Sequence, residues 1–162
     1  MTILYFVLPF AVWSLCALHD LTSFKIPNRY VAVLAVGFLP AAFLAGLPLS
    51  LLAASAAFAA IMLVAGFALF ATGTLGAGDA KLIAASALWI GPAAAAPFVL
   101  YTTLVGAALG LILLQARKAP LPAGLARFGW VRGLHARERV MPYGVAIAAG
   151  GMMAMPQSVF AG

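Results

Sequence analysis

The sequence predicts an all-α protein, a polytopic membrane helix bundle of about six transmembrane helices built as one domain over residues 1–162. Composition is the first observation: 66% of the residues are hydrophobic, 7% are charged and the mean hydropathy is +1.15. The second is the length of the uncharged stretches, which reach the roughly 20 residues that a helix needs to cross a bilayer. A soluble domain of this size would need a charged surface that these residues cannot provide.

The first three spans are expected before residue 73. Residues 2–18 form the first, which is retained rather than cleaved because it lacks the positive n-region of a signal peptide. Pro27 should end any helix arriving there, and Asn28 can cap the helix that follows. Residues 30–72 carry no formal charge, so they predict a hairpin of two spans that turns at 46–48.

Three further spans follow. Residues 82–115 are uncharged, and the break at Gly91 and Pro92 divides them into spans four and five, of which the fourth can begin at Asp79. Basic and apolar residues alternate over 117–139, which predicts a short amphipathic segment on an anionic membrane face rather than a nucleic-acid site. The final span is expected within 140–160.

Charge supports this arrangement. All nine Lys and Arg residues fall near 20–29, 73–81 and 117–139, and six spans place these three segments on the same side of the membrane. The positive-inside rule makes that side cytoplasmic. Both termini then lie outside.

Acidic residues are rare, and two of the three lie at predicted span ends. The three are Asp20, Asp79 and Glu138, and an ionisable group at the edge of a span is by default a functional candidate. The topology places Asp20 and Asp79 at the same face. Two neighbouring carboxyl groups can share a proton, so that one activates a water and the other donates to a peptide carbonyl. The pair therefore predicts aspartyl proteolysis without a metal or another cofactor.

Simpler interpretations exist for each residue. Asp20 could be a helix-end acid paired with Lys25, and Asp79 could be a helix N-cap. Lys81 is most simply a topology determinant, although it could stabilise the ionised pair. Glu138 is expected to form solvated pairs with its arginine neighbours.

Other chemistries find little support in the sequence. A single cysteine, Cys16, excludes a disulfide within the chain and a four-cysteine zinc site, and the two histidines are far apart. Gly76 and Gly78 beside Asp79 would instead allow an extended substrate to come close to the acid.

Three motifs resemble the type IV prepilin peptidases, most of all the compact members associated with Flp or Tad pili. Asp20 is followed by Ile26-Pro27-Asn28, the Gly-x-Gly-Asp element continues to Lys81, and Met141-Pro142-Tyr143-Gly144 resembles the family's Pro-Tyr/Phe-Gly segment. The resemblance implies a multi-pass protease of the bacterial inner membrane that removes the basic leader of prepilins or pseudopilins at the cytoplasmic face. It implies Asp20 and Asp79 as catalytic residues, with loop and substrate-positioning residues at Gly76, Gly78, Lys81, Pro27, Asn28, Pro142 and Gly144.

One departure from the family narrows this expectation. Longer members resemble bifunctional enzymes whose cytoplasmic insert carries paired Cys-x-x-Cys motifs and N-methylates the new amino terminus, whereas this chain has one cysteine and no such insert. We therefore expect peptidase activity without methyltransferase activity. The alternatives are a small proton-coupled transporter and a noncatalytic subunit of a secretion or pilus machine. The oligomeric state is not determined by the sequence.

Overall fold

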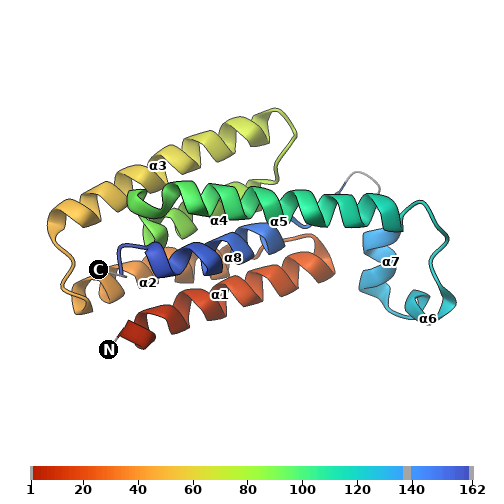
Figure 1. Cartoon of the computed structure of the whole chain (residues 1–162), viewed down its shortest axis with the longest axis horizontal. Helices are drawn as coiled ribbons and strands as arrows, with labels where there is room; N and C mark the ends of the chain where they lie inside the picture. Colours follow the sequence, from red (N-terminus) through yellow and green to blue (C-terminus); the bar gives the residue numbers. More distant parts are fainter. Residues whose placement is uncertain (1, 137–139, 161–162) are drawn as a thin grey trace.

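Helices form the computed structural model, which describes residues 2–136 and 140–160, with side chains from residue 5 on (Figure 1). Within these ranges there is no strand, so the predicted all-α fold is confirmed. The elements in chain order are α1 (Thr2–Ser23), α2 (Asn28–Leu44), α3 (Leu49–Ala71), α4 (Ala77–Ile90), the 3-10 turn η1 (Pro92–Ala94), α5 (Ala95–Ala116), α6 (Ala123–Ala126), α7 (Gly129–Ala136), α8 (Tyr143–Ala154) and the 3-10 turn η2 (Met155–Gln157).

Six apolar helices lie where the six spans were predicted, but their lengths differ. Among the described residues, three helical stretches are long and apolar enough to cross a bilayer: Tyr5–Ser23, Leu49–Ala71 and Pro92–Ala116. By contrast, α2 has 17 residues, α4 has 14 and α8 has 12. At 1.5 Å per residue α4 is about 21 Å long, less than the roughly 30 Å of a hydrocarbon core. The crossing of the membrane by these three helices stays a prediction.

The breaks between helices lie at the helix-breaking residues predicted from the sequence, with one correction. Pro27 is extended and precedes α2, and Gly91 ends α4 with a φ of 70°, a conformation that glycine adopts without strain. The prediction that Asn28 caps α2 is wrong, because the N-cap is Pro27 and Asn28 is already the first helical residue. Its side chain is used elsewhere, as described below.

Buried indoles fasten α4 to its neighbours. Trp13 of α1 donates its indole N–H to Ser86 Oγ at 2.9 Å, and Trp89 donates to the Leu34 carbonyl of α2 at 2.8 Å. Both indoles are fully buried, so each N–H needs such a partner. These bonds fix α4 against α1 and α2, while α3 packs along its length.

The last helix completes the bundle. Figure 1 shows α8 between α1 and α5, and it packs against both. The approach to α1 is very close: a Cβ at Gly151 would lie 2.7 Å from Trp13 Cζ2. Small residues allow such close helix contacts.

The basic region forms two short helices at one end of the bundle (Figure 1). Helix α7 is amphipathic, burying Leu134 and exposing Trp130 and Arg132. The guanidinium of Arg117 donates to the Leu134 carbonyl at 2.8 Å and to the Val140 carbonyl at 2.9 Å, which holds α7 against the end of α5. Contact of this segment with lipid stays a prediction. The expected pairs of Glu138 lie outside the described residues.

Gly151→Ala should destabilise the protein, because the added methyl group would force α8 away from Trp13. Overpacking of this kind costs about 1–3 kcal/mol. We expect a lower unfolding temperature in detergent.

Gly129→Ala is the matched control, because a Cβ at Gly129 would meet no atom within 4 Å. It should leave the unfolding temperature unchanged or raise it slightly, since alanine favours helix over glycine. Equal unfolding temperatures for the two variants would contradict the close packing of α1 and α8.

Candidate active site

Asp20 lies in the last turn of α1 and is 5% exposed. Its Oδ2 accepts a hydrogen bond of 2.7 Å from the backbone N–H of Gly144, which lies in the first turn of α8. The first N–H groups of a helix have no partner within the helix, so this donor is available. A charge-assisted bond of this length favours the ionised carboxylate.

Only glycine fits opposite Asp20. A Cβ at Gly144 would lie 2.9 Å from Asp20 Oδ2 and 2.9 Å from Ile26 Cδ1. The adjacent Pro142 is buried and precedes α8 as its N-cap residue. The sequence motif that contains Pro142 and Gly144 therefore contacts Asp20 through Gly144.

Asp79 occupies the third position of α4, and the N-cap is Gly76. The N-cap interpretation of Asp79 is therefore wrong in position, although its Oδ2 does accept a hydrogen bond of 3.2 Å from the Gly76 N–H. Its second oxygen, Oδ1, is buried and has no hydrogen-bond partner among the described residues. A buried carboxylate oxygen without a donor is costly, which favours a protonated Asp79 in the absence of substrate.

The two aspartates line the same cavity, of about 390 Å³, although they come from different helices. Six residues expected at the site are brought together there: Asp20, Asn28, Gly76, Gly78, Asp79 and Lys81. Pro27 lies in the chain between the lining residues Ile26 and Asn28. Gly144 contacts Asp20, and Pro142 begins the helix that carries Gly144. The other lining residues are Phe24, Lys25, Ile26 and Ala77.

Lys81 is held by the side chain of Asn28. Its Nζ donates to Asn28 Oδ1 at 3.3 Å, which joins the second turn of α4 to the first turn of α2 beside the cavity. Lys81 is partly buried, whereas Asn28 is exposed. The predicted helix cap is thus replaced by a contact between helices, and both residues help to shape one wall of the site.

Ile26 was not predicted as a site residue. It lies against both glycine motifs: a Cβ at Gly78 would be 3.3 Å from Ile26 Cβ, and a Cβ at Gly144 would meet Ile26 Cδ1. Phe24, which also lines the cavity, has a φ of 56° that is unusual for a non-glycine residue. The motif Ile26-Pro27-Asn28 could have indicated Ile26 as a site residue. Nothing in the sequence indicates Phe24.

Burial and a neighbouring charge both act on Asp79, which lies outside the three stretches long enough to cross a bilayer. The pKa of its carboxyl is raised to about 7: burial is the largest cause, the nearby Asp20 also raises it, and the hydrogen bond from Gly76 acts in the opposite direction. The raised pKa agrees with the unpartnered Oδ1. Within 2–136 and 140–160, no three His, Cys, Asp or Glu side chains gather as a metal site requires.

Comparisons with known proteins agree with this site. The type IV leader peptidase family matches residues 6–111, a range that includes both aspartates. A prepilin leader peptidase/N-methyltransferase of Xanthomonas campestris pv. campestris is 46% identical over 63 residues, which cover 35% of this chain and 22% of that protein. The match thus spans about a fifth of the relative's length. No solved structure shows a significant match.

Infrared titration should detect the interaction of the two carboxyls, because the chain has only three acidic side chains. We expect a carboxyl that titrates near pH 7 and is absent in Asp79→Asn. In Asp20→Asn it should titrate at lower pH, since a neighbouring negative charge no longer disfavours ionisation. The same titration in both wild type and Asp20→Asn would show that the two groups do not interact.

Proposed function

The chain belongs to the type IV leader peptidase family, and we propose that it is a prepilin leader peptidase that uses Asp20 and Asp79 as an aspartyl protease pair. Its substrates are prepilins or pseudopilins, cut at the cytoplasmic face of a bacterial inner membrane. One observation carries the proposal: the buried carboxyl group of Asp20 and the half-buried carboxyl group of Asp79 come from separate helices and line one cavity at the end of the bundle.

The two carboxyls have different surroundings, which suggests different roles. Asp20 receives the strong hydrogen bond from Gly144, so it is the ionised member and takes a proton from the attacking water. Asp79 has a buried unpartnered oxygen and a raised pKa, so it is the neutral member and donates to the peptide carbonyl. The water oxygen bonds to the carbonyl carbon, giving a tetrahedral diol.

Breakdown of the diol restores both acids. Asp20, now protonated, gives its proton to the leaving nitrogen as the carbon–nitrogen bond breaks. Asp79, now ionised, recovers a proton from one hydroxyl of the diol as the carboxylic acid product forms. The cycle consumes one water and one peptide bond, and each aspartate acts once as acid and once as base.

The surrounding residues prepare the cavity for an extended peptide. Gly76 and Gly78 carry no side chain that would block the approach to Asp79. Lys81 and Asn28 hold the N-terminal parts of α4 and α2 together, which keeps Asp79 at a fixed place relative to α2. We assign these residues to positioning rather than to proton transfer.

The proposed activity is limited to peptide cleavage. Cys16, the single cysteine, is buried within α1 and cannot form the paired Cys-x-x-Cys motifs expected of the methylating members. We propose that the chain processes pilins of the Flp or Tad type and leaves the new amino terminus unmethylated.

Asp20→Asn and Asp79→Asn should each lower the rate of leader removal by about 100-fold or more, because each deletes one proton-transfer group. The measurement is co-expression with a candidate prepilin, followed by sequencing of the pilin's amino terminus. That sequencing also shows whether the terminus is methylated.

Glu138→Gln is the control, because it removes the only other acidic side chain. It should leave cleavage unchanged, and all variants should accumulate in the membrane. Full cleavage by either aspartate variant would rule out the two-aspartate mechanism.

Activity should decrease as pH rises through about 7, because Asp79 loses the proton that it must donate. The direction of this pH dependence follows from the raised pKa: Asp79 is neutral below about pH 7 and ionised above it. The measurement is kcat/KM across this range with purified enzyme in detergent. A value that is constant from about pH 6 to pH 9 would contradict a neutral Asp79 as the proton donor.

A further inference from the structure

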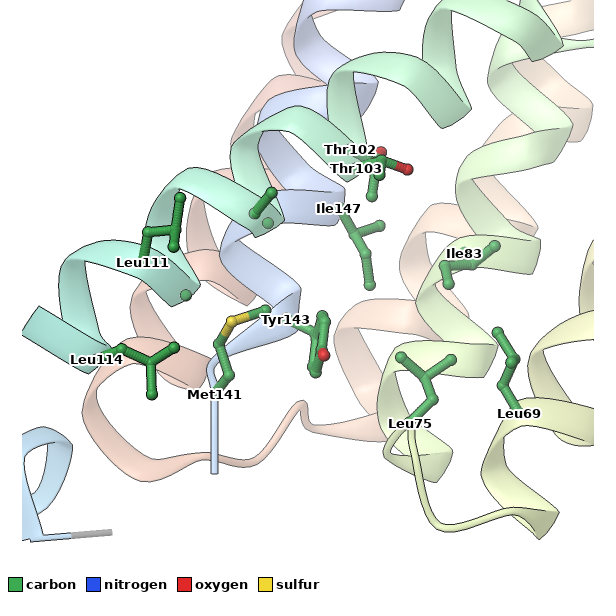
Figure 2. A pocket seen from close by; sticks show the side chains of 13 residues that line it. Leu69, Leu75, Ile83, Thr102, Thr103, Leu111, Leu114, Met141, Tyr143 and Ile147 are labelled. Atoms are coloured by element: carbon green, nitrogen blue, oxygen red, sulfur yellow. The ribbon is translucent and has the colours of Figure 1, made fainter. Parts of the chain in front are cut away.

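A second cavity, of about 670 Å³, lies between α3 and α4 on one side and α5 and α8 on the other (Figure 2). It arises because the helices pack as pairs: α3 lies along α4 and α5 along α8, whereas α4 and α5 contact each other only slightly. Figure 2 shows labelled side chains of α5 and α8 facing those of α3 and α4 across the gap. We call this cavity the apolar groove.

One face of α5 forms a wall of the groove. Its lining residues recur at the spacing of a helical face, at 102, 103, 106, 107, 110, 111 and 114. Thr103 and Ala107 are the exposed small residues of this face and Leu111 and Leu114 are its exposed large ones, whereas Gly106 is buried against Ala146 of α8. Small residues flanked by large apolar ones favour the close approach of another helix.

The groove is continuous with the residues that hold both aspartates. Its lining includes Leu75, which precedes Gly76, and Ile83, which lies one helical turn beyond Asp79. Tyr143, which precedes the Asp20 partner Gly144, also lines the groove. A neighbouring cavity shares Gly110, Leu114, Met141 and Tyr143 with the groove and extends it to Thr74 and Arg117 at the polar end of the bundle.

We propose that the apolar groove binds an apolar transmembrane helix of the substrate polypeptide, the segment adjoining the peptide bond that Asp20 and Asp79 cut. This inference rests on the proposed function and deepens it, since it assigns the substrate's membrane segment to a surface of the enzyme. A bond cut at a membrane face belongs to a chain whose apolar part still needs a surface within the bilayer. The groove supplies that surface beside the reacting groups.

A polypeptide helix fits these observations better than a lipid chain. A lipid chain would need no row of small residues, whereas a helix backbone gains close contacts from the exposed small residues Thr103 and Ala107. Binding of a lipid would also not require the groove to lie beside the segments that hold the two aspartates. The groove therefore orients a substrate, with its bound helix leading directly to Asp79.

Photo-crosslinking tests this proposal without requiring catalysis. A benzoylphenylalanine is placed at Ala107, which lines the groove, or at Ala108, an exposed neighbour on the same helix that lines none of the described cavities. Both are made in the full chain with Asp79→Asn, so that a bound prepilin stays intact. We expect a crosslink to the prepilin's apolar segment from 107 and none above background from 108.

Two results would overturn the proposal. Crosslinks from 107 only to lipid would assign the groove to lipid chains. Equal crosslinking of the prepilin from 107 and 108 would indicate nonspecific contact with the surface of α5.

Activity provides the second test, with Ala107→Trp filling the groove and Ala108→Trp as the matched control. Ala107→Trp should lower kcat/KM for a membrane-inserted prepilin by about tenfold or more, as lost binding energy predicts. Ala108→Trp should leave it unchanged. Equal activity of both variants would overturn docking in the groove.

The outcomes separate this inference from the proposed function. If the wild-type chain cleaves no prepilin, the proposed function fails whatever the crosslinks show. If it cleaves prepilin but Ala107→Trp has full activity, only the docking site fails.

Discussion

The hydrogen bond from the Gly144 N–H to the Asp20 carboxylate is the interaction on which the site depends. It joins residues 124 positions apart and brings the first turn of α8 against the last turn of α1. A buried carboxylate needs such a donor, and the free N–H groups at a helix start provide one without another charge. The absence of a side chain at Gly144 allows the 2.7 Å contact, and packing of Gly151 against Trp13 keeps α8 close enough to make it.

The second acid depends on how α4 is held. Asp79 lies in the first turn of a helix that is fastened by two indole hydrogen bonds and by the contact between Lys81 and Asn28. Gly76 and the first turn of α4 lie beside the end of α1, so the two carboxyls share one cavity. Ile26 separates the two glycine motifs and thereby sets the distance between the first turns of α4 and α8.

The sequence predicted the features that depend on local chemistry. Pro27 and Gly91 mark helix ends because their effects on the backbone are local, and the rarity of acids in an apolar chain singled out Asp20 and Asp79. Contacts between distant residues could not be predicted in the same way. The motif containing Gly144 was recognised, but its hydrogen bond to Asp20 follows only from the packing of α8. The cap assigned to Asn28 was wrong for the same reason, since a local preference gave way to a contact with Lys81. The apolar groove had no local signal, because it results from the sparse packing of α5 against α3 and α4, which are distant from it in sequence.

The two cavities that α4 lines along its length differ in chemistry, and the acids lie in the polar one. One cavity is lined by lysines, an asparagine and both aspartates, and the other almost entirely by apolar residues. A membrane-anchored substrate has the same two parts, a polar strand to be cut and an apolar helix to be held. Asp79 faces the polar cavity while Ile83, one turn away on the same helix, lines the groove. A single short helix can therefore separate the two parts of a substrate at the bond between them, which is where hydrolysis requires the backbone to leave the helical state.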